Sequence, residues 1–193
     1  GMRAYYYHKK EHFESLPDTE NEIIFLGNSI TDNCEWAELF GNPNIKNRGI
    51  GGDDTDGILE RLEEVTASDP SKIFILIGTN DLAYGTSPDH VVENIGQIID
   101  RIQADSPNTI IYIQGVLPVD DAVHYTRKNG DIIRINRELK KLENDRGIVY
   151  IDLHSEFLNE DGILDTEYSI DGLHLNGKGY QLWKELISKH VSE

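Results

Sequence analysis

Short apolar runs alternate with longer amphipathic segments along most of this chain, and that alternation constrains the fold more than any other feature of the sequence. Most of the short runs are nearly continuous in apolar residues, as expected for strands that are covered on both faces. They occupy residues 22–27, 45–50, 72–78, 109–116 and 148–152. Each run is therefore predicted to be a β-strand.

The longer segments place apolar residues three and four positions apart, which is the spacing of one face of an α-helix. They occupy residues 55–67, 88–104, 132–144 and 179–190. Local signals support two of the helix starts. Ser87 precedes Pro88 and is predicted to be an N-cap, while Asp54 or Thr55 is predicted to cap the helix over residues 55–67.

Strands that alternate with helices predict a parallel sheet joined by right-handed crossovers. The pattern predicts an α/β fold, a flavodoxin-like three-layer α/β/α sandwich with a five-stranded parallel sheet. The 193 residues fit a single domain, residues 1–193, with residues 1–20 as an N-terminal extension that packs on or near it. In such folds a ligand binds beyond the carboxyl ends of the strands.

The chain is strongly acidic, with 35 Asp and Glu residues against 18 Lys and Arg and a formal net charge of −17. Such a surface repels a nucleic-acid backbone and disfavours anionic membranes, so no nucleic-acid partner is expected. No apolar run approaches the ~20 residues that cross a bilayer, so no membrane insertion is expected. Cys34 is the only cysteine, which excludes an intrachain disulfide.

Residues 1–14 are aromatic and basic and lack the apolar core of a signal peptide. Gly1 before Met2 has the form of a tag-cleavage scar. A cytoplasmic location follows if Met2 is the native start, and a periplasmic or secreted location follows if a signal peptide was trimmed. His8 and His12 lie four residues apart, but with lysines beside them they are interpreted as part of a solvated segment rather than as a metal site.

Small polar residues follow three of the predicted strands and recur near the C-terminus. Residues 27–32 (GNSITD), 47–53 (NRGIGGD) and 78–81 (GTND) come after the first three runs, and residues 171–176 (DGLHLN) lie near the end of the chain. Because the carboxyl ends of parallel strands meet at one edge of the sheet, we expect the first three segments to share a cleft.

These four segments hold the side chains that acyl transfer requires. A serine hydroxyl needs a neighbouring base, and we predict Ser29 as the nucleophile with His174 as its general base. Asp171 can orient the imidazole and stabilise its cation. The backbone N–H groups of Ser29 and Gly52 and the side-chain amide of Asn80 are predicted to form an oxyanion hole, in which one donor is typically worth ~3–4 kcal/mol. Taken singly, Ser29 also fits a helix N-cap, Gly52 a turn and Asn80 an Asx-turn.

Taken in order, the four segments resemble the blocks of the SGNH hydrolase superfamily, also called the GDSL family. Ser29, Gly52, Asn80 and His174 match its first, second, third and fifth blocks, and the resemblance runs from about Ile23 to the C-terminus. The stretch over residues 48–53 (RGIGGD), followed by residues 59–62 (LERL), is similar to the catalytic subunits of platelet-activating-factor acetylhydrolase.

The resemblance implies a flavodoxin-like sandwich that hydrolyses carboxylic esters without a metal or an organic cofactor. Asp171 matches the triad aspartate, although some members work largely as a Ser–His dyad. The chain departs from the family in the first block, where Gly27-Asn28-Ser29-Ile30 stands in place of Gly-Asp-Ser-Leu and removes the charge at position 28. Related branches dimerise, so a homodimer is left open.

Short connections between the segments offer no insertion that would form a lipase lid, which favours an open site and a short acyl group such as acetyl. The aromatic N-terminus and residues 34–36 (CEW) also resemble bacterial carbohydrate O-acetylesterases. We therefore expect a small-molecule ester of a carbohydrate or a similarly polar alcohol. The alternatives are a lipid acylhydrolase of the platelet-activating-factor acetylhydrolase or lysophospholipase type, a non-catalytic glycan-binding module, and a flavodoxin-like nucleotide binder.

Several other polar residues have competing interpretations. Asp152 and His154 form a rival base pair, although Asp152 is expected to end the fifth strand and His154 to lie on the rim. Asp53 is expected to support the oxyanion loop, the segment that carries Gly52. The acidic neighbours of Asp53 do not fit an EF-hand. A dinucleotide loop would need a glycine where Asp54 stands, and an α/β-hydrolase elbow would need one where Thr31 stands.

Overall fold

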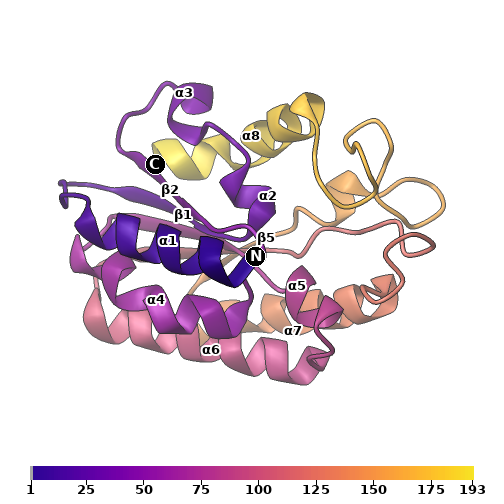
Figure 1. Cartoon of the computed structure of the whole chain (residues 1–193), viewed down its shortest axis with the longest axis horizontal. Coiled ribbons are helices and arrows are strands. Elements are labelled where there is room, and N and C mark those ends of the chain that lie inside the picture. The colour runs from indigo at the N-terminus through magenta and orange to yellow at the C-terminus, as the bar shows by residue number, and fades with distance from the viewer. Residues whose placement is uncertain (1) are drawn as a thin grey trace.

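The computed structural model describes residues 2–193 and contains five parallel strands in the order β2-β1-β3-β4-β5 (Figure 1). Their bounds are Ile23–Gly27 for β1, Ile45–Gly49 for β2, Lys72–Leu76 for β3, Ile110–Gln114 for β4 and Val149–Ile151 for β5. The predicted five-stranded parallel sheet is confirmed. Every strand after β1 ends one or two residues earlier than predicted, because the following residues leave the sheet as loops. Gly1, interpreted above as a tag remnant, lies outside the described residues.

The order of the strands reverses direction between β1 and β3. The chain leaves β1 for β2 on one side, and β3 then pairs on the other side of β1 before the sheet continues to β4 and β5. Gly27, which ends β1, pairs in register with Gly49 of β2 and Leu76 of β3. The crevice at the carboxyl ends of such strands is the usual ligand site of an open α/β sheet. Ser29 follows β1 and Asn80 follows β3, so both lie at this crevice.

Helices cover both faces of the sheet and give the predicted three layers (Figure 1). One face is covered by α4 (Thr55–Ala67), α6 (Pro88–Asp105) and α7 (Asn129–Arg146). The other face is covered by α2 (Ser29–Asp32), α3 (Trp36–Phe40) and α8 (Gly177–Ser192). Three elements remain: α1 (Met2–Ser15), the short α5 (Thr79–Ala83) and a 3-10 turn at Ser155–Phe157. Of these, α1 contacts α4.

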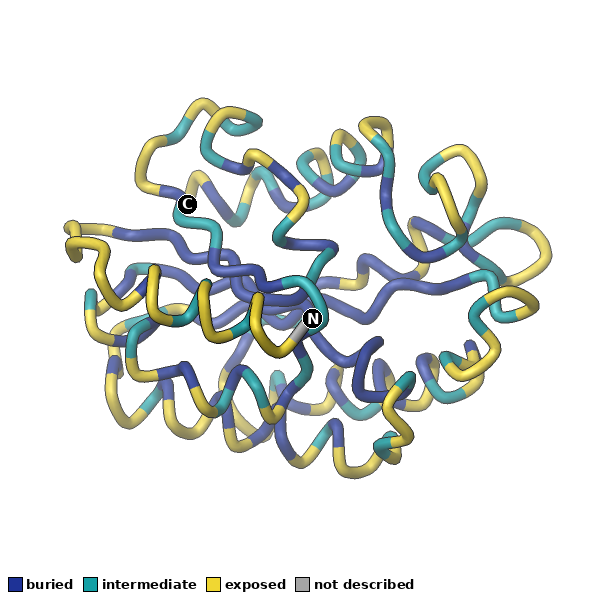
Figure 2. Tube along the Cα trace, in the orientation of Figure 1, coloured by how far each residue is buried: buried dark blue, intermediate teal, exposed yellow. Residues whose placement is uncertain are grey.

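Two apolar clusters fill the spaces between these layers. The cluster beneath α4, α6 and α7 is almost entirely aliphatic, and Ile75, Ile95 and Ile135 are typical members. The cluster beneath α3 and α8 is rich in aromatic residues, with the rings of Trp36 and Trp183 packed edge to face and their centroids 4.6 Å apart. Figure 2 shows the strands as a largely buried centre, with exposed residues along the outer faces of the helices. Burial on both faces accounts for the continuous apolar runs of the sequence.

Side-chain caps fix where two of the long helices begin. Asp54 accepts a hydrogen bond from Gly57 N at 2.8 Å at the start of α4. Ser87 accepts one from His90 N at 3.2 Å, and Pro88 occupies the first turn of α6. Both helix starts agree with the prediction. By contrast, α7 begins three residues before its predicted start, because the polar residues of its first turn carry no apolar periodicity.

The N-terminal residues form a helix, α1, that the apolar pattern does not indicate. The helix is held by a few specific contacts: the Tyr6 hydroxyl donates to the carbonyl oxygen of Gly57 at 2.6 Å, and the Phe13 ring is buried beneath the guanidinium of Arg48. His8 and His12 are exposed on this helix, as expected for a solvated segment. A helix anchored by two or three tertiary contacts needs no continuous apolar stripe, which is why the sequence pattern missed it.

Residues 2–193 contain neither a candidate membrane span nor a candidate metal cluster. No helix in this part of the chain is long and apolar enough to cross a membrane. No group of three or more His, Cys, Asp and Glu side chains among these residues has an arrangement that could hold a metal ion.

Candidate active site

Ser29 is the first residue of α2 and follows the tight turn that ends β1. Asn28 is the N-cap, and its side chain accepts a hydrogen bond from Ile30 N at 3.1 Å. The capping role considered for Ser29 therefore belongs to Asn28, and the Ser29 hydroxyl is left for another partner. The turn needs glycine at position 27, since a Cβ on Gly27 would lie 2.6 Å from the carbonyl oxygen of Leu76.

The hydroxyl of Ser29 lies beside the imidazole of His174, from the opposite end of the chain. Ser29 Oγ is 3.2 Å from His174 Nε2, and His174 Nδ1 is 2.7 Å from Asp171 Oδ2. The three side chains form a continuous hydrogen-bonded chain from hydroxyl to carboxylate. Because Asp171 accepts the proton of Nδ1, a neutral imidazole presents its Nε2 lone pair to Ser29.

A tight turn holds Asp171 and His174 in this arrangement. Asp171 Oδ1 accepts hydrogen bonds from the backbone N–H of Leu173 at 2.9 Å and of His174 at 2.7 Å. Gly172 within the turn has a φ of +80°, which other residues seldom adopt. Burial acts to raise the pKa of Asp171, but the hydrogen bonds from the His174 ring and from the two backbone groups outweigh it and lower the pKa to about 2. Asp171 is therefore ionised at neutral pH.

Gly52 and Asn80 follow β2 and β3 and line the same cleft as Ser29. Gly52 has a φ of +85°, and the Tyr84 hydroxyl donates to its carbonyl oxygen at 2.8 Å, which fixes the peptide plane. Asn80 Nδ2 donates one hydrogen bond to the carbonyl oxygen of Asp53 at 2.9 Å. An amide nitrogen carries two protons, so Asn80 retains a second donor for a group in the cleft.

A buried ion pair supports the loop that carries Gly52. The side chains of Asp53 and Arg61 are each 2% exposed and lie 2.8 Å apart. Arg61 also donates to the carbonyl oxygens of Gly27 at 3.1 Å and of Arg48 at 2.8 Å, so it ties the ends of β1 and β2 to α4. These contacts match the supporting role expected for Asp53.

Two residues line the cleft that the sequence reasoning did not identify, Tyr5 and Arg127. The Tyr5 hydroxyl reaches from α1 and donates to Asp32 Oδ2 at 2.7 Å. Arg127 lies in the loop before α7 and donates from Nη2 to Asn80 Oδ1 at 3.0 Å. The aromatic composition of the N-terminus was a weak signal for Tyr5, whereas no motif or spacing pointed to Arg127. With these two residues the cleft has a volume of about 510 Å³.

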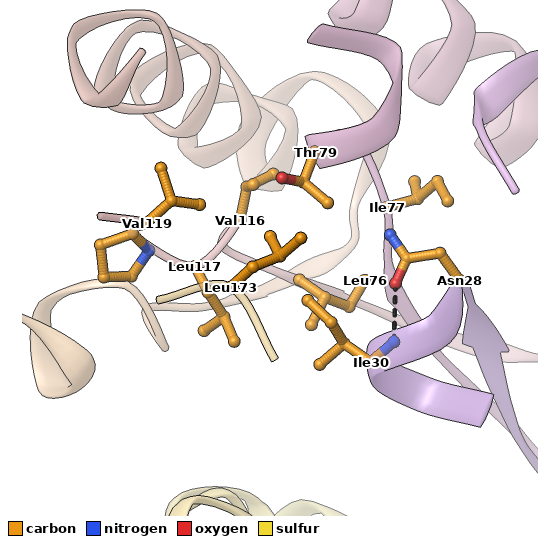
Figure 3. A pocket seen from close by; sticks show the side chains of 10 residues that line it. Asn28, Ile30, Leu76, Ile77, Thr79, Val116, Leu117, Val119 and Leu173 are labelled. Carbon is orange, nitrogen blue, oxygen red and sulfur yellow. Dashed lines mark hydrogen bonds between the residues drawn. The ribbon is translucent and has the colours of Figure 1, made fainter. Parts of the chain in front are cut away.

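A small apolar cavity adjoins the cleft next to Ser29. Ile30, Thr79 and Leu173 line both spaces. Figure 3 shows that the wall opposite Ile30 comes from the segment after β4, with Val116, Leu117 and Val119. The cavity has a volume of about 10 Å³, close to the minimum that holds one water molecule. It therefore has room for a group no larger than a methyl without rearrangement of its walls.

Four residues considered from the sequence lie outside this arrangement. Asp152 accepts hydrogen bonds from the backbone N–H and hydroxyl of Ser155 at 3.1 and 2.7 Å, and it does not orient a base. His154 is buried, which corrects the prediction that it lies on the rim: the chain turns inward after β5, and burial lowers the pKa of the imidazole. Cys34 and Trp36 are buried in the aromatic cluster and do not line the cleft.

Comparison with known proteins identifies the family that shares these residues. The profile of the GDSL-like lipase/acylhydrolase family matches residues 25–182, a range that includes Ser29, Gly52, Asn80 and His174. The chain belongs to the GDSL-like lipase/acylhydrolase family. It is accordingly a hydrolase of the acyl-ester type.

Relatives of this GDSL hydrolase include named proteins and solved structures. Platelet-activating factor acetylhydrolase IB subunit alpha2 of Rattus norvegicus is 30% identical over 171 residues, which span 84% of this chain and 72% of the relative. A solved structure from Streptococcus pneumonia, named for platelet activating factor, is 29% identical with a TM-score of 0.87 and covers 98% of this chain and 92% of that chain. An acetyl-xylooligosaccharide esterase from Geobacillus Stearmophilus shares the fold at 18% identity and a TM-score of 0.73, over 91% of this chain and 96% of that chain.

Proposed function

We propose that this GDSL hydrolase is a serine esterase that removes a short acyl group, acetyl above all, from a carbohydrate or a similarly polar alcohol. Ser29 is the proposed nucleophile, His174 the general base, and Asp171 the residue that orients the base. The observation that carries the proposal is the hydrogen-bonded chain from Ser29 Oγ to His174, at 3.2 Å, and from His174 to Asp171, at 2.7 Å.

The first half of the reaction acylates the serine. Ser29 Oγ attacks the ester carbonyl carbon while His174 Nε2 accepts the hydroxyl proton, and the ionised Asp171 stabilises the resulting imidazolium. The carbonyl oxygen becomes an oxyanion that receives hydrogen bonds from the backbone N–H groups of Ser29 and Gly52 and from Asn80 Nδ2. The intermediate then expels the alcohol oxygen, which takes the proton from His174.

The second half hydrolyses the acyl-enzyme. A water molecule gives its proton to His174 Nε2 and attacks the acyl carbon, and the same donors hold the second oxyanion. When this intermediate collapses, Ser29 Oγ leaves the carbon and recovers its proton from His174. The carboxylic acid is released, and the free enzyme is restored without any group other than water being consumed.

The apolar cavity next to Ser29 supports a short acyl group. Ile30, Thr79 and Leu173 line both the cleft that holds the serine and this cavity, whose volume is about 10 Å³. A methyl group fits such a space, but each further methylene would force packed side chains apart, at a cost typically of about 1–3 kcal/mol for overpacking. The name of the rat relative, an acetylhydrolase, points in the same direction.

One polar side chain at the cleft supports a polar alcohol. The phenol of Tyr5 lines the cleft of about 510 Å³, and its hydroxyl oxygen can accept a hydrogen bond from a hydroxyl group of the substrate. An alkyl chain offers no such donor.

Covalent labelling tests the proposed nucleophile. A fluorophosphonate probe is expected to modify Ser29 in the wild-type protein, as mapped by mass spectrometry, and Ser29→Ala is expected to take up no probe and to lose hydrolysis of p-nitrophenyl acetate. Ser155→Ala is the matched control, because Ser155 bonds Asp152 away from the cleft and should leave turnover unchanged. Full activity in Ser29→Ala would refute the proposed mechanism.

An acyl-length series tests the proposed substrate. Values of kcat/KM for p-nitrophenyl acetate, butyrate and octanoate should fall with length, and a panel of acetylated sugars should release acetate. A preference for octanoate over acetate would overturn the short-acyl proposal. Leu173→Ala supplies an internal check, because enlarging the cavity should raise activity on butyrate relative to acetate.

The second candidate is an acetyl ester carried by a lipid. Val123, Tyr125 and Ile170 are 61%, 74% and 74% exposed and lie on two loops that meet through a hydrogen bond from Asp120 N to the Gly172 carbonyl oxygen at 2.8 Å. Together with the named relatives, these exposed apolar side chains favour an amphiphilic alcohol. The acetylated sugars and an acetylated ether phospholipid, compared at equal concentration by kcat/KM, distinguish the two candidates.

A further inference from the structure

The loop between β4 and α7 contacts both halves of the proposed catalytic machinery. On one side Asp120 N donates to the Gly172 carbonyl oxygen, and a ring nitrogen of His124 lies 2.8 Å from the carbonyl oxygen of Asp171. On the other side Arg127 donates to Asn80. One segment of about eight residues therefore spans from the turn that carries Asp171 to the side chain of Asn80.

Arg127 lacks the ion pair that four of the eight arginines of this acidic chain form. Arg48, Arg61, Arg134 and Arg146 each form an ion pair with a carboxylate. Arg127 pairs with no carboxylate among residues 2–193, and its Nε is buried there without a hydrogen-bond partner. A charge that is partly buried without an ion-pair partner is unfavourable for folding. An arginine in this state at the cleft therefore points to a role in the site.

The contacts of Arg127 and Asp53 select one orientation of the Asn80 amide. In the observed orientation Oδ1 accepts from Arg127 Nη2 at 3.0 Å, and Nδ2 donates to the carbonyl oxygen of Asp53 at 2.9 Å. Rotation of the amide by half a turn would place two donors face to face at Arg127 and two acceptors face to face at Asp53. Both contacts therefore fix the direction in which Nδ2 and its second N–H point.

We propose that Arg127 is a positioning residue of the oxyanion hole, which holds the Asn80 amide with Nδ2 turned to the cleft and polarises its free N–H. The proposal rests on the function proposed above. Arg127 acts through Asn80: its positive charge at Oδ1 draws electron density from the amide, which strengthens the bond that Nδ2 donates to an oxyanion. The donor matters most when the carbonyl oxygen carries a full charge, so the effect belongs to the transition state rather than to substrate binding.

Single variants give the first test. Arg127→Met, which keeps the length of the side chain but removes its charge and donors, is expected to lower kcat for p-nitrophenyl acetate by about 10- to 100-fold, with KM changed less than about twofold. Arg127→Lys, which retains a cationic donor, should recover a large part of that loss. Arg134→Met is the matched control on the exposed face of α7 and should leave kcat unchanged. Thermal unfolding of each variant reports whether the fold is intact.

A double-mutant cycle separates positioning from direct contact. Asn80→Ala is expected to lower kcat by about 100- to 1,000-fold, and Arg127→Met added to Asn80→Ala should cost less than about twofold more. Additive losses, or a loss expressed mainly in KM, would show that Arg127 contacts the substrate or supports the fold, and either result would overturn the proposal. Activity that survives Ser29→Ala would instead refute the proposed function, so the two failures are distinguishable.

A transition-state analogue provides a reading that does not depend on residual turnover. A trifluoromethyl ketone adds to a serine hydroxyl and leaves an oxyanion in the hole. The inhibition constant should rise in Arg127→Met by the same factor as the loss in kcat/KM, and Arg127→Lys should reverse most of that rise. An inhibition constant unchanged in Arg127→Met would contradict the proposal.

Discussion

At the scale of single residues, Asp171 and Asp81 show how local surroundings shift two similar groups in opposite directions. Hydrogen bonds from His174 and from two backbone N–H groups keep the pKa of Asp171 low, despite the opposing effect of burial. Asp81 is 1% exposed and receives bonds from the Thr55 hydroxyl at 2.6 Å and the Thr55 N–H at 3.2 Å. These neutral donors do not replace the lost hydration, so burial raises the pKa of Asp81 to about 6.

The raised pKa of Asp81 predicts a pH dependence of stability. In the unfolded chain this group titrates near 3.8, so between about pH 4 and pH 6 the folded state holds a proton that the unfolded state has lost. The contribution of Asp81 to the free energy of unfolding should therefore fall as pH rises through this window, by up to about 3 kcal/mol. Asp81→Asn cannot titrate, and urea unfolding at pH 4, 5 and 6 should show a flatter dependence than the wild type. Parallel curves for the two proteins would contradict this assignment.

At the scale of elements, the start of α4 decides where the loop of Gly52 ends. Asp54 caps the helix by accepting a hydrogen bond from Gly57 N. The preceding residue, Asp53, forms an ion pair with Arg61, which lies further along the same helix. In the same turn, the Gly57 carbonyl oxygen accepts a hydrogen bond from the Tyr6 hydroxyl of α1. One helix N-terminus thus carries the contacts that hold the oxyanion loop and those that hold the N-terminal helix.

The cap of α4 gives a prediction at this scale. Asp54→Ala removes the side-chain acceptor of Gly57 N and should lower the free energy of unfolding by about 1 kcal/mol, a typical value for the loss of an aspartate cap. Ser87→Ala removes the cap of α6, which lies away from Gly52, and should cost a similar amount. Urea unfolding should show a lower free energy of unfolding for both variants. Only Asp54→Ala should also lower kcat for p-nitrophenyl acetate. An Asp54→Ala protein as active as Ser87→Ala would show that the cap does not position the loop.

At the scale of the whole molecule, the excess of negative charge sets the electrostatic background. The chain carries a net charge of −17, and only a minority of the 35 acidic residues have an ion-pair partner within residues 2–193. Like charges on a compact surface repel one another and favour the more expanded unfolded chain. Salt screens interactions beyond about 10 Å at 0.1 M and so relieves part of that repulsion.

Screening predicts that salt stabilises the protein at neutral pH. Raising NaCl from about 0.02 M to about 0.3 M should raise Tm, with each kcal/mol of relieved repulsion worth about 2–4 °C for a chain of this size. The same change of salt near pH 4.7, where the net charge is close to zero, should have a much smaller effect. A fall in Tm with salt at pH 7 would mean that attractive surface pairs outweigh the net repulsion.

The parts of the fold that could be predicted are those that depend on short-range patterns in the sequence. Strands covered on both faces must be apolar along their length, and helices with one buried face must place apolar residues every three or four positions. Both patterns can be recognised without knowing which elements pack against each other. Ser87 and Asp54 cap helices through bonds to residues three positions away, and they too were predictable. The start of α7 and all of α1 were not, because a few contacts with residues distant in the sequence hold them.

The amino-acid sequence by itself determined the order of strands and helices, the type of sheet, and which polar segments follow which strand, because each of these depends on residues that are close neighbours along the chain. Only the tertiary structure decided that Ser29 Oγ lies 3.2 Å from His174 Nε2, that Arg127 reaches Asn80, and that Tyr5 closes one side of the cleft. Such contacts join residues far apart in the chain, and their geometry is set by how the layers pack, which no short-range spacing records.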